Sequence, residues 1–94
     1  MTSLPIEVHP LAQNEADEAF EYYRERSWKV AQRFLAQLAI AREAIQQSPD
    51  SWQAYLYGTR RYLVARYPYV VVYRARKDRI EIIAFAHGRR KPGY

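Results

Sequence analysis

Residues 67–94 read YPYVVVYRARKDRIEIIAFAHGRRKPGY and hold the strongest strand signals in the chain. Two apolar runs, residues 70–75 and 80–86, flank the polar segment Arg76–Arg79, a pattern that predicts a β-hairpin. The second run is apolar at both odd and even positions, which is typical of a central strand covered on two faces. One face is expected to hold Ile80, Ile82 and Ala84, and the other Ile83 and Phe85. The chain then ends in a basic segment.

The residues before this hairpin predict a third strand and a loop. The segment Arg60–Arg66 has strand alternation, and Tyr67–Tyr69 is expected to form the turn into the hairpin because it contains a proline. Upstream, residues 49–59 are predicted to be a loop rich in aromatic side chains, namely Trp52, Tyr55 and Tyr57. Such side chains either stack on nucleic-acid bases or close the edge of a small core, and both interpretations stay open.

The first fifty residues change from a strand pattern to a helix pattern. Residues 4–9 alternate apolar and polar side chains, as a short edge strand does. Two amphipathic helices are then predicted, from Leu11 to about Arg26 and from Trp28 to about Gln47, with Ser27 as the N-cap of the second. The whole chain, residues 1–94, is therefore predicted to be a single α+β domain of order β-α-α-β-β-β, in which a helical hairpin packs on a mostly antiparallel sheet.

Charge is distributed unevenly along the 94 residues, although the net charge is only +5. Residues 1–50 carry five basic and eight acidic side chains, whereas residues 51–94 carry ten basic and two acidic ones. This asymmetry indicates a surface that meets a polyanion or an acidic partner, and the alternative is a basic excess that only aids solubility. The chain has no cysteine, no apolar run long enough to span a membrane and no secretory signal pattern, so a cytoplasmic protein is expected.

Most site chemistries are disfavoured by what the sequence lacks. The only histidines are His9 and His87, neither has a second ligand at zinc spacing, and the three glycines form no phosphate-binding loop. No metal or cofactor is therefore expected. The remaining arginine, histidine and tyrosine side chains suit phosphodiester cleavage of RNA, in which cations stabilise the transition state and the 2′-OH is the nucleophile. The alternative is that His87 ends a strand and the basic residues after it are a solvated tail.

Several segments together resemble toxins of the RelE/ParE superfamily from bacterial type II toxin–antitoxin systems. They are the helical hairpin, the stop at Ser48-Pro49, the run from Arg61 through Tyr67-Pro68-Tyr69 to Tyr73, and the closing stretch His87-Gly88-Arg89-Arg90-Lys91-Pro92. The resemblance covers nearly the whole chain. It implies a small basic toxin that is neutralised by a cognate antitoxin protein, whose acidic, partly disordered tail wraps the toxin.

The superfamily divides by target, and the resemblance implies different roles for the same residues. RelE-like members cleave mRNA on the ribosome, whereas ParE-like members poison DNA gyrase. A nuclease would use Arg61, His87, Arg90 and Tyr94 as catalytic residues and Arg60, Arg66, Arg89 and Lys91 as nucleic-acid contacts. RelE-like nucleases usually carry cations where this chain has Val70 and Leu63. The closing His87, Arg90 and Tyr94 favour a metal-independent, ribosome-dependent endoribonuclease, and the alternatives are a gyrase poison or a non-catalytic RNA-binding module.

Overall fold

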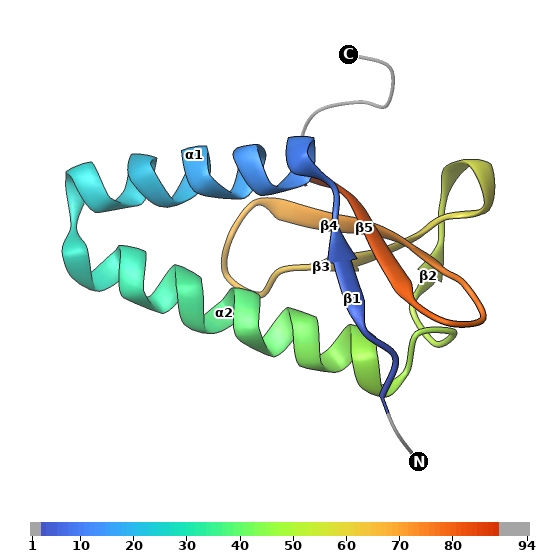
Figure 1. Cartoon of the computed structure of the whole chain (residues 1–94). Coiled ribbons are helices and arrows are strands. Elements are labelled where there is room, and N and C mark those ends of the chain that lie inside the picture. The colour runs from blue at the N-terminus through green and yellow to red at the C-terminus, as the bar shows by residue number, and fades with distance from the viewer. Residues whose placement is uncertain (1–2, 89–94) are drawn as a thin grey trace.

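The computed structural model describes residues 3–88, and its elements follow the expected order. They are β1 (Ile6–Val8), α1 (Pro10–Arg26), α2 (Trp28–Gln47), β2 (Gln53–Ala54), the 3-10 helix η1 (Leu56–Gly58), β3 (Arg60–Leu63), β4 (Tyr69–Ala75) and β5 (Ile80–His87). Figure 1 shows the two helices as an antiparallel pair that lies beside the sheet. The predicted α+β fold with a helical hairpin is confirmed.

Ser27 joins the two helices through hydrogen bonds of its own. Its backbone N–H donates to the carbonyl of Tyr23 at 2.8 Å, which closes the last turn of α1. Its side-chain oxygen accepts from the N–H of Val30 at 3.3 Å, so the predicted N-cap of α2 is confirmed. Because a single residue ends one helix and begins the next, the hairpin is tight and the two apolar faces meet.

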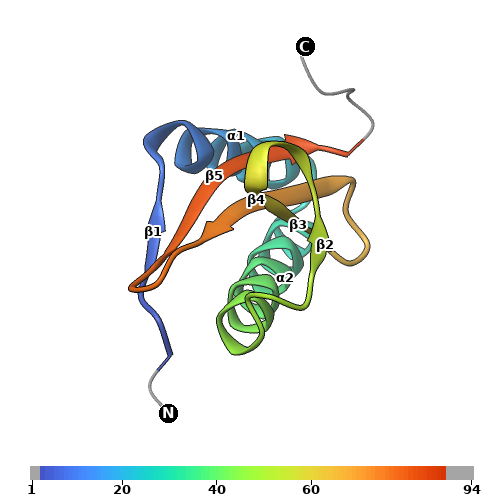
Figure 2. The ribbon, with the colours of Figure 1, turned by 90° about the vertical axis from the view of Figure 1, so that its right-hand side faces the viewer.

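The sheet contains five strands in the order β1-β5-β4-β3-β2. Figure 2 shows β1 and β2 at its opposite sides. The pairs β5–β4, β4–β3 and β3–β2 are antiparallel, whereas β1 pairs with β5 in parallel. The expectation of a mostly antiparallel sheet with the last strand inside it is therefore confirmed. Pairing of β1 with β5 brings the two ends of the described chain into one sheet.

The core lies between the helical hairpin and one face of the sheet. Phe34 and Ile45 of α2 and Tyr73 and Ile80 of the sheet are its largest fully buried side chains. The hydroxyl of Tyr73 donates to the carbonyl of Pro49, just beyond α2, at 2.7 Å. Burial also raises the pKa of the Tyr73 hydroxyl to about 12, because the phenolate form would lose its hydration. The buried hydroxyl thus ties the end of α2 to the centre of the sheet.

Two predicted boundaries differ from the structure. The strand expected over Arg60–Arg66 ends at Leu63, because Arg66 lies in a turn with a left-handed backbone at φ 69°. The loop expected over residues 49–59 contains β2 and η1. Within it, Trp52 closes the core edge by donating from its indole nitrogen to the Ala44 carbonyl at 3.1 Å.

The expected alternation along β5 is wrong beyond Ile82. The register against β4 shifts between Val72 and Tyr73, where a β-bulge in β5 changes which side chains face the helices. Phe85 is consequently buried in the core, whereas the pattern had placed it opposite Ile80. The bulge therefore moves an aromatic side chain to the core face.

We expect Tyr73→Phe to lower the free energy of unfolding by about 1–3 kcal/mol, because the Pro49 carbonyl loses its buried donor. Urea denaturation followed by circular dichroism measures the change. Tyr57→Phe is the matched control, since Tyr57 is 91% exposed and should change stability by less than about 0.5 kcal/mol. Equal stabilities of the two variants would contradict the structural role of the Tyr73 hydroxyl.

Candidate functional site

A groove of about 1360 Å³ runs along β5 between α1 and the loop that contains η1. Its floor is apolar and includes Val72 of β4 and Ile83, Ala84 and Ala86 of β5. Its rim is polar, with Glu15 and Glu18 on α1, Arg74 on β4 and Arg76 just after β4. An apolar centre inside a charged rim is the composition of a protein-binding surface.

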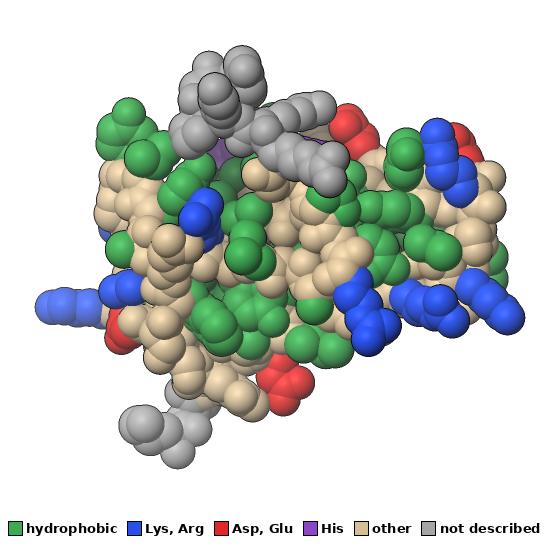
Figure 3. All heavy atoms as spheres, turned by 180° about the vertical axis from the view of Figure 1, so that it is seen from behind, with side chains coloured by type: hydrophobic (Ala, Val, Ile, Leu, Met, Phe, Trp, Pro, Cys, Tyr) green, Lys and Arg blue, Asp and Glu red, His purple; other side chains and the backbone are tan. Residues whose placement is uncertain are grey.

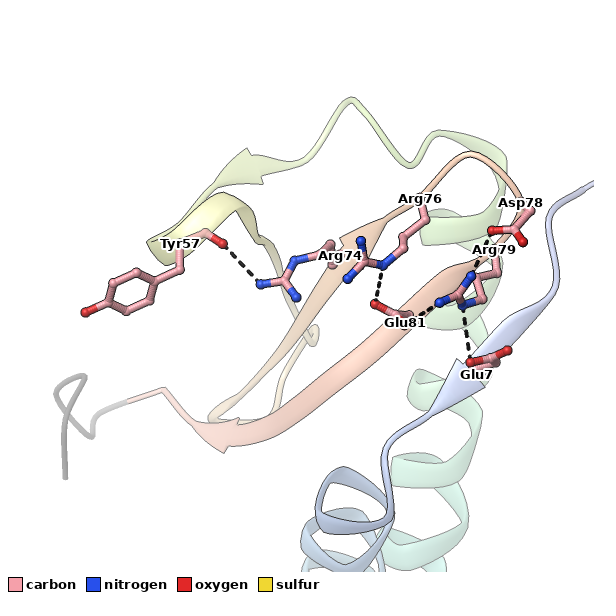
Figure 4. Close-up of polar contacts among 7 residues, drawn as sticks. All are labelled: Glu7, Tyr57, Arg74, Arg76, Asp78, Arg79 and Glu81. Atoms are coloured by element: carbon pink, nitrogen blue, oxygen red, sulfur yellow. Dashed lines mark hydrogen bonds and ion pairs between the residues drawn. The ribbon is translucent and has the colours of Figure 1, made fainter.

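The cations at the hairpin end of this groove are held by neighbouring acceptors. Arg76 donates from Nε to Glu81 at 2.8 Å, and Arg79 donates from Nη2 to the same carboxylate at 3.1 Å. Arg79 also pairs with Asp78 at 3.0 Å and with Glu7 of β1 at 3.4 Å, as Figure 4 shows. The hydrogen bond from Arg76, aided by Arg79, holds the pKa of Glu81 below its usual value. These ion pairs join β1 and β5 to the connection between β4 and β5.

Arg74 has a different acceptor, the backbone of η1. Its Nη2 donates to the carbonyl of Tyr57 at 3.1 Å (Figure 4). Tyr57 adopts a left-handed backbone at φ 55° and is followed by Gly58 at φ 74°. The hydroxyl and backbone N–H of Thr59 both donate to the Leu56 carbonyl, which closes the turn. The loop that borders the groove is thus fixed by hydrogen bonds on both sides.

The two predicted basic residues of β3 are bound to the preceding segment. Arg60 donates from Nη1 to the Trp52 carbonyl at 2.8 Å. Arg61 donates from Nε to the side chain of Gln53 at 2.8 Å, and its guanidinium lies 5.1 Å from the ring centre of Tyr55. Both arginines therefore help to attach β2 and its loop to the sheet.

Arg61 and His87 project from opposite faces of the sheet. Residues that are directly opposite in a ladder share a face, and Arg61 is opposite Val72, on the face away from the helices. His87 is opposite Tyr69, whose ring packs against Phe34 of α2, so His87 lies on the helix-facing side. The structure does not bring these two predicted catalytic side chains together.

The other predicted site residues have different positions. Arg66 is exposed in the turn between β3 and β4. His87 lines the groove, and its ring contacts Tyr69 edge-to-face with the ring centres 5.5 Å apart. The predicted residues of the closing segment, Arg89, Arg90, Lys91 and Tyr94, lie outside the described residues.

Val70, which stands where RelE-like nucleases usually carry a cation, has apolar neighbours in the structure. Val70 is 7% exposed and pairs with Leu63 on one side and Ala86 on the other. Backbone at Gly88 lies against it, held by a hydrogen bond of 2.6 Å from the Gly88 N–H to the Pro68 carbonyl. The sheet face around Val70 is therefore a patch of aliphatic side chains.

Sequence patterns did not single out Glu15. Its carboxylate accepts from the backbone N–H of Phe85 at 3.1 Å. The partner strand β1 pairs with β5 only as far as Ile82, so Glu15 occupies the edge of β5 that β1 leaves open. A carboxylate on a helix face gives no local signal of such a contact, because the two residues are seventy positions apart.

Residues 6–92 match the family model described as the ParE toxin of the type II toxin–antitoxin system parDE. The chain belongs to the ParE toxin family. The match includes both helices, every strand and most of the closing basic segment. The protein is accordingly a toxin component of a type II system, as the sequence resemblance had implied, and this class of toxin has a cognate antitoxin.

The fold of this ParE-family toxin is similar to that of a solved structure described as the chromosomal ParDE TA system from P. aeruginosa. The TM-score is 0.70, the sequence identity is 17%, and the alignment covers 90% of this chain and 96% of the other. At this identity the similarity shows the fold alone. No curated protein sequence matches the chain.

Between residues 3 and 88, no helix is long and apolar enough to cross a membrane. Within the same range, no group of three histidine, aspartate or glutamate side chains is arranged to hold a metal ion.

We expect Glu15→Ala to speed hydrogen exchange of the Phe85 amide by about tenfold, the equivalent of one lost hydrogen bond of roughly 1.4 kcal/mol. Exchange rates measured by NMR test this. Glu18→Ala is the matched control, because Glu18 also lines the groove on α1 but makes no hydrogen bond to β5. Identical Phe85 rates in the two variants would show that water replaces Glu15 at no cost.

Proposed function

We propose that this ParE-family toxin arrests growth by binding DNA gyrase and does not cleave mRNA. The separation of Arg61 and His87 on opposite sheet faces carries the proposal. Phosphodiester cleavage requires cations and a proton-transfer group that converge on one phosphate. Inhibition by binding requires only a surface complementary to the target.

The bonded arginines and the aliphatic patch around Val70 also favour DNA gyrase as the target. The aliphatic side chains around Val70 occupy the position where a nuclease would need a cation. Arg60, Arg61 and Arg74 are each engaged by groups of the loop before β3, so they stabilise the fold. The groove beside β5 offers an apolar floor with a charged rim, which suits a protein partner.

The proposal includes neutralisation by an antitoxin with an acidic tail. Membership of a type II family implies such a partner, and the ten basic against two acidic side chains in residues 51–94 suit an acidic tail. A tail of this kind orders on binding and can cover a large part of the toxin surface.

Cleavage of mRNA on the ribosome is the second candidate function. It is favoured by the sequence of the closing segment, in which His87 is followed by Arg90 and Tyr94. For cleavage, a side chain of the closing segment would have to supply the positive charge that is missing at Val70. A non-catalytic RNA-binding module is the third candidate and differs from both others because its overexpression would be harmless.

Induced expression of the chain distinguishes these functions. We expect growth arrest, inhibition of DNA supercoiling by purified gyrase and intact mRNA in primer-extension assays. Coexpression of a neighbouring gene product with an acidic tail should restore growth. Breaks within codons of translated mRNA, with gyrase activity unchanged, would overturn the gyrase proposal in favour of the nuclease.

The variant His87→Gln separates catalysis from binding. If His87 transferred a proton, mRNA cleavage would fall by about 100- to 10,000-fold. A gyrase poison should keep its inhibition to within about tenfold, since most interface side chains contribute less than roughly 1.4 kcal/mol. Arg90→Ala is measured beside it, because both residues belong to the predicted catalytic set. A loss of more than 100-fold in mRNA cleavage on His87→Gln would contradict the proposal.

A further inference from the structure

Three exposed cations form a row at the end of the molecule where the helices meet. We name Lys29 and Arg33 of α2 and Arg66 of the β3–β4 turn the cationic row. Lys29 and Arg33 are four residues apart in a helix, so they lie on the same face one turn from each other. Figure 3 shows Lys and Arg side chains gathered at the lower right, over the end of the molecule where α1 and α2 meet.

The β3–β4 turn is fastened to this part of α2. The hydroxyl of Tyr67, next to Arg66, donates to the carbonyl of Val30 at 3.0 Å. Val30 directly follows Lys29 in the sequence. It also lies three residues before Arg33, so the two are neighbours on the helix surface. The turn itself is closed by a hydrogen bond of 3.0 Å from the Val64 N–H to the Tyr69 carbonyl. The fold therefore holds the residue next to Arg66 against the turn of α2 that carries Lys29 and Arg33.

The cationic row lies in segments that have no acidic side chains. The sequence contains no aspartate or glutamate between Glu25 and Glu43, nor anywhere in residues 51–77. By contrast, Arg24 at the end of α1 is paired with Glu21 at 2.7 Å. Positive potential along the row is thus not cancelled by carboxylates of the same two segments.

Fold stability does not explain why these positions carry cations. The first turn of α2 contains no acidic residue, and Lys29 lies there, where the helix dipole favours negative charge. Arg66 holds a left-handed backbone at φ 69°, a conformation that glycine or asparagine adopts more readily. Such positions are frequent at binding sites, where the side chain is needed in spite of the backbone.

We propose that the cationic row binds the phosphodiester backbone of a nucleic acid. Arg33 and Arg66 supply planar donors that match phosphate oxygens, and Lys29 adds a point charge. This site goes beyond the proposed action on gyrase, because it is separate from the groove beside β5 and would serve with either target. The sequence had placed Arg66 among nucleic-acid contacts, and the structure adds two residues from the acidic half of the chain.

Fluorescence anisotropy with a 20-bp duplex DNA and the duplex RNA of the same sequence tests the proposal. Each phosphate contact contributes about −0.9 to the slope of log K against log salt. Arg33→Gln/Arg66→Gln should therefore reduce the slope by about 1.8 and weaken binding at 0.1 M salt by about 60-fold. Stronger binding of one duplex over the other identifies the source of the phosphates, and either result supports the site.

Arg42→Gln/Lys77→Gln is the matched control, because it removes the same charge from exposed positions outside the row. We expect it to weaken binding by less than about threefold. Equal effects of the two double variants would overturn the proposal, since they would reflect net charge alone. Binding that neither variant changes would also overturn it and leave an acidic protein as the partner of the row. Unchanged urea midpoints in both variants establish that the fold is intact.

Discussion

Phe34 is the side chain on which the packing of the two layers depends. It is fully buried, and its ring lies 5.2–5.9 Å, centre to centre, from those of Tyr23, Tyr67, Tyr69 and Phe85. These four rings come from α1, the β3–β4 turn, β4 and β5. Tilted and edge-to-face ring pairs contribute about 0.5–1.5 kcal/mol each beyond area burial. One residue of α2 thus joins every element that borders the end of the molecule where the helices meet.

This ring cluster also positions charges at the surface. Tyr67 contacts Phe34 from the sheet side and bonds to the backbone of α2, so the turn that carries Arg66 cannot move away from the helix without breaking both contacts. Arg33 precedes Phe34 in sequence and points outward from the same turn of helix. Core packing therefore fixes the backbone that carries the cationic row. A pre-arranged set of cations binds with a smaller loss of side-chain and loop freedom.

The fold was predictable from sequence wherever a periodic pattern had a single solution. Helical spacing and Ser27 defined the helical hairpin, and the apolar runs defined the β4–β5 pair. The β-bulge was not predictable, because β5 is apolar on both faces and alternation fits either phase. Stacking of Phe85 on Tyr69 at 4.7 Å and its contact with Phe34 select the phase, and both contacts arise only in the tertiary structure. The two-residue strand β2 likewise depends on contacts with Arg60 and Arg61 of β3, which arise only in the tertiary structure.

The candidate site was less predictable, because charge counted along a sequence does not show which cations have partners. The basic half of the chain supplies Arg74, Arg76 and Arg79, yet each is bonded to a carboxylate or a backbone carbonyl. The half with a net negative charge supplies Lys29 and Arg33, which lie in a helix segment without acidic residues. Coulomb attraction falls with distance and is screened beyond about 8–10 Å at physiological salt, so only nearby carboxylates neutralise a surface cation. The availability of a basic side chain for a phosphate or a partner is consequently set by its immediate neighbours in the fold and not by the net charge of the segment that contains it.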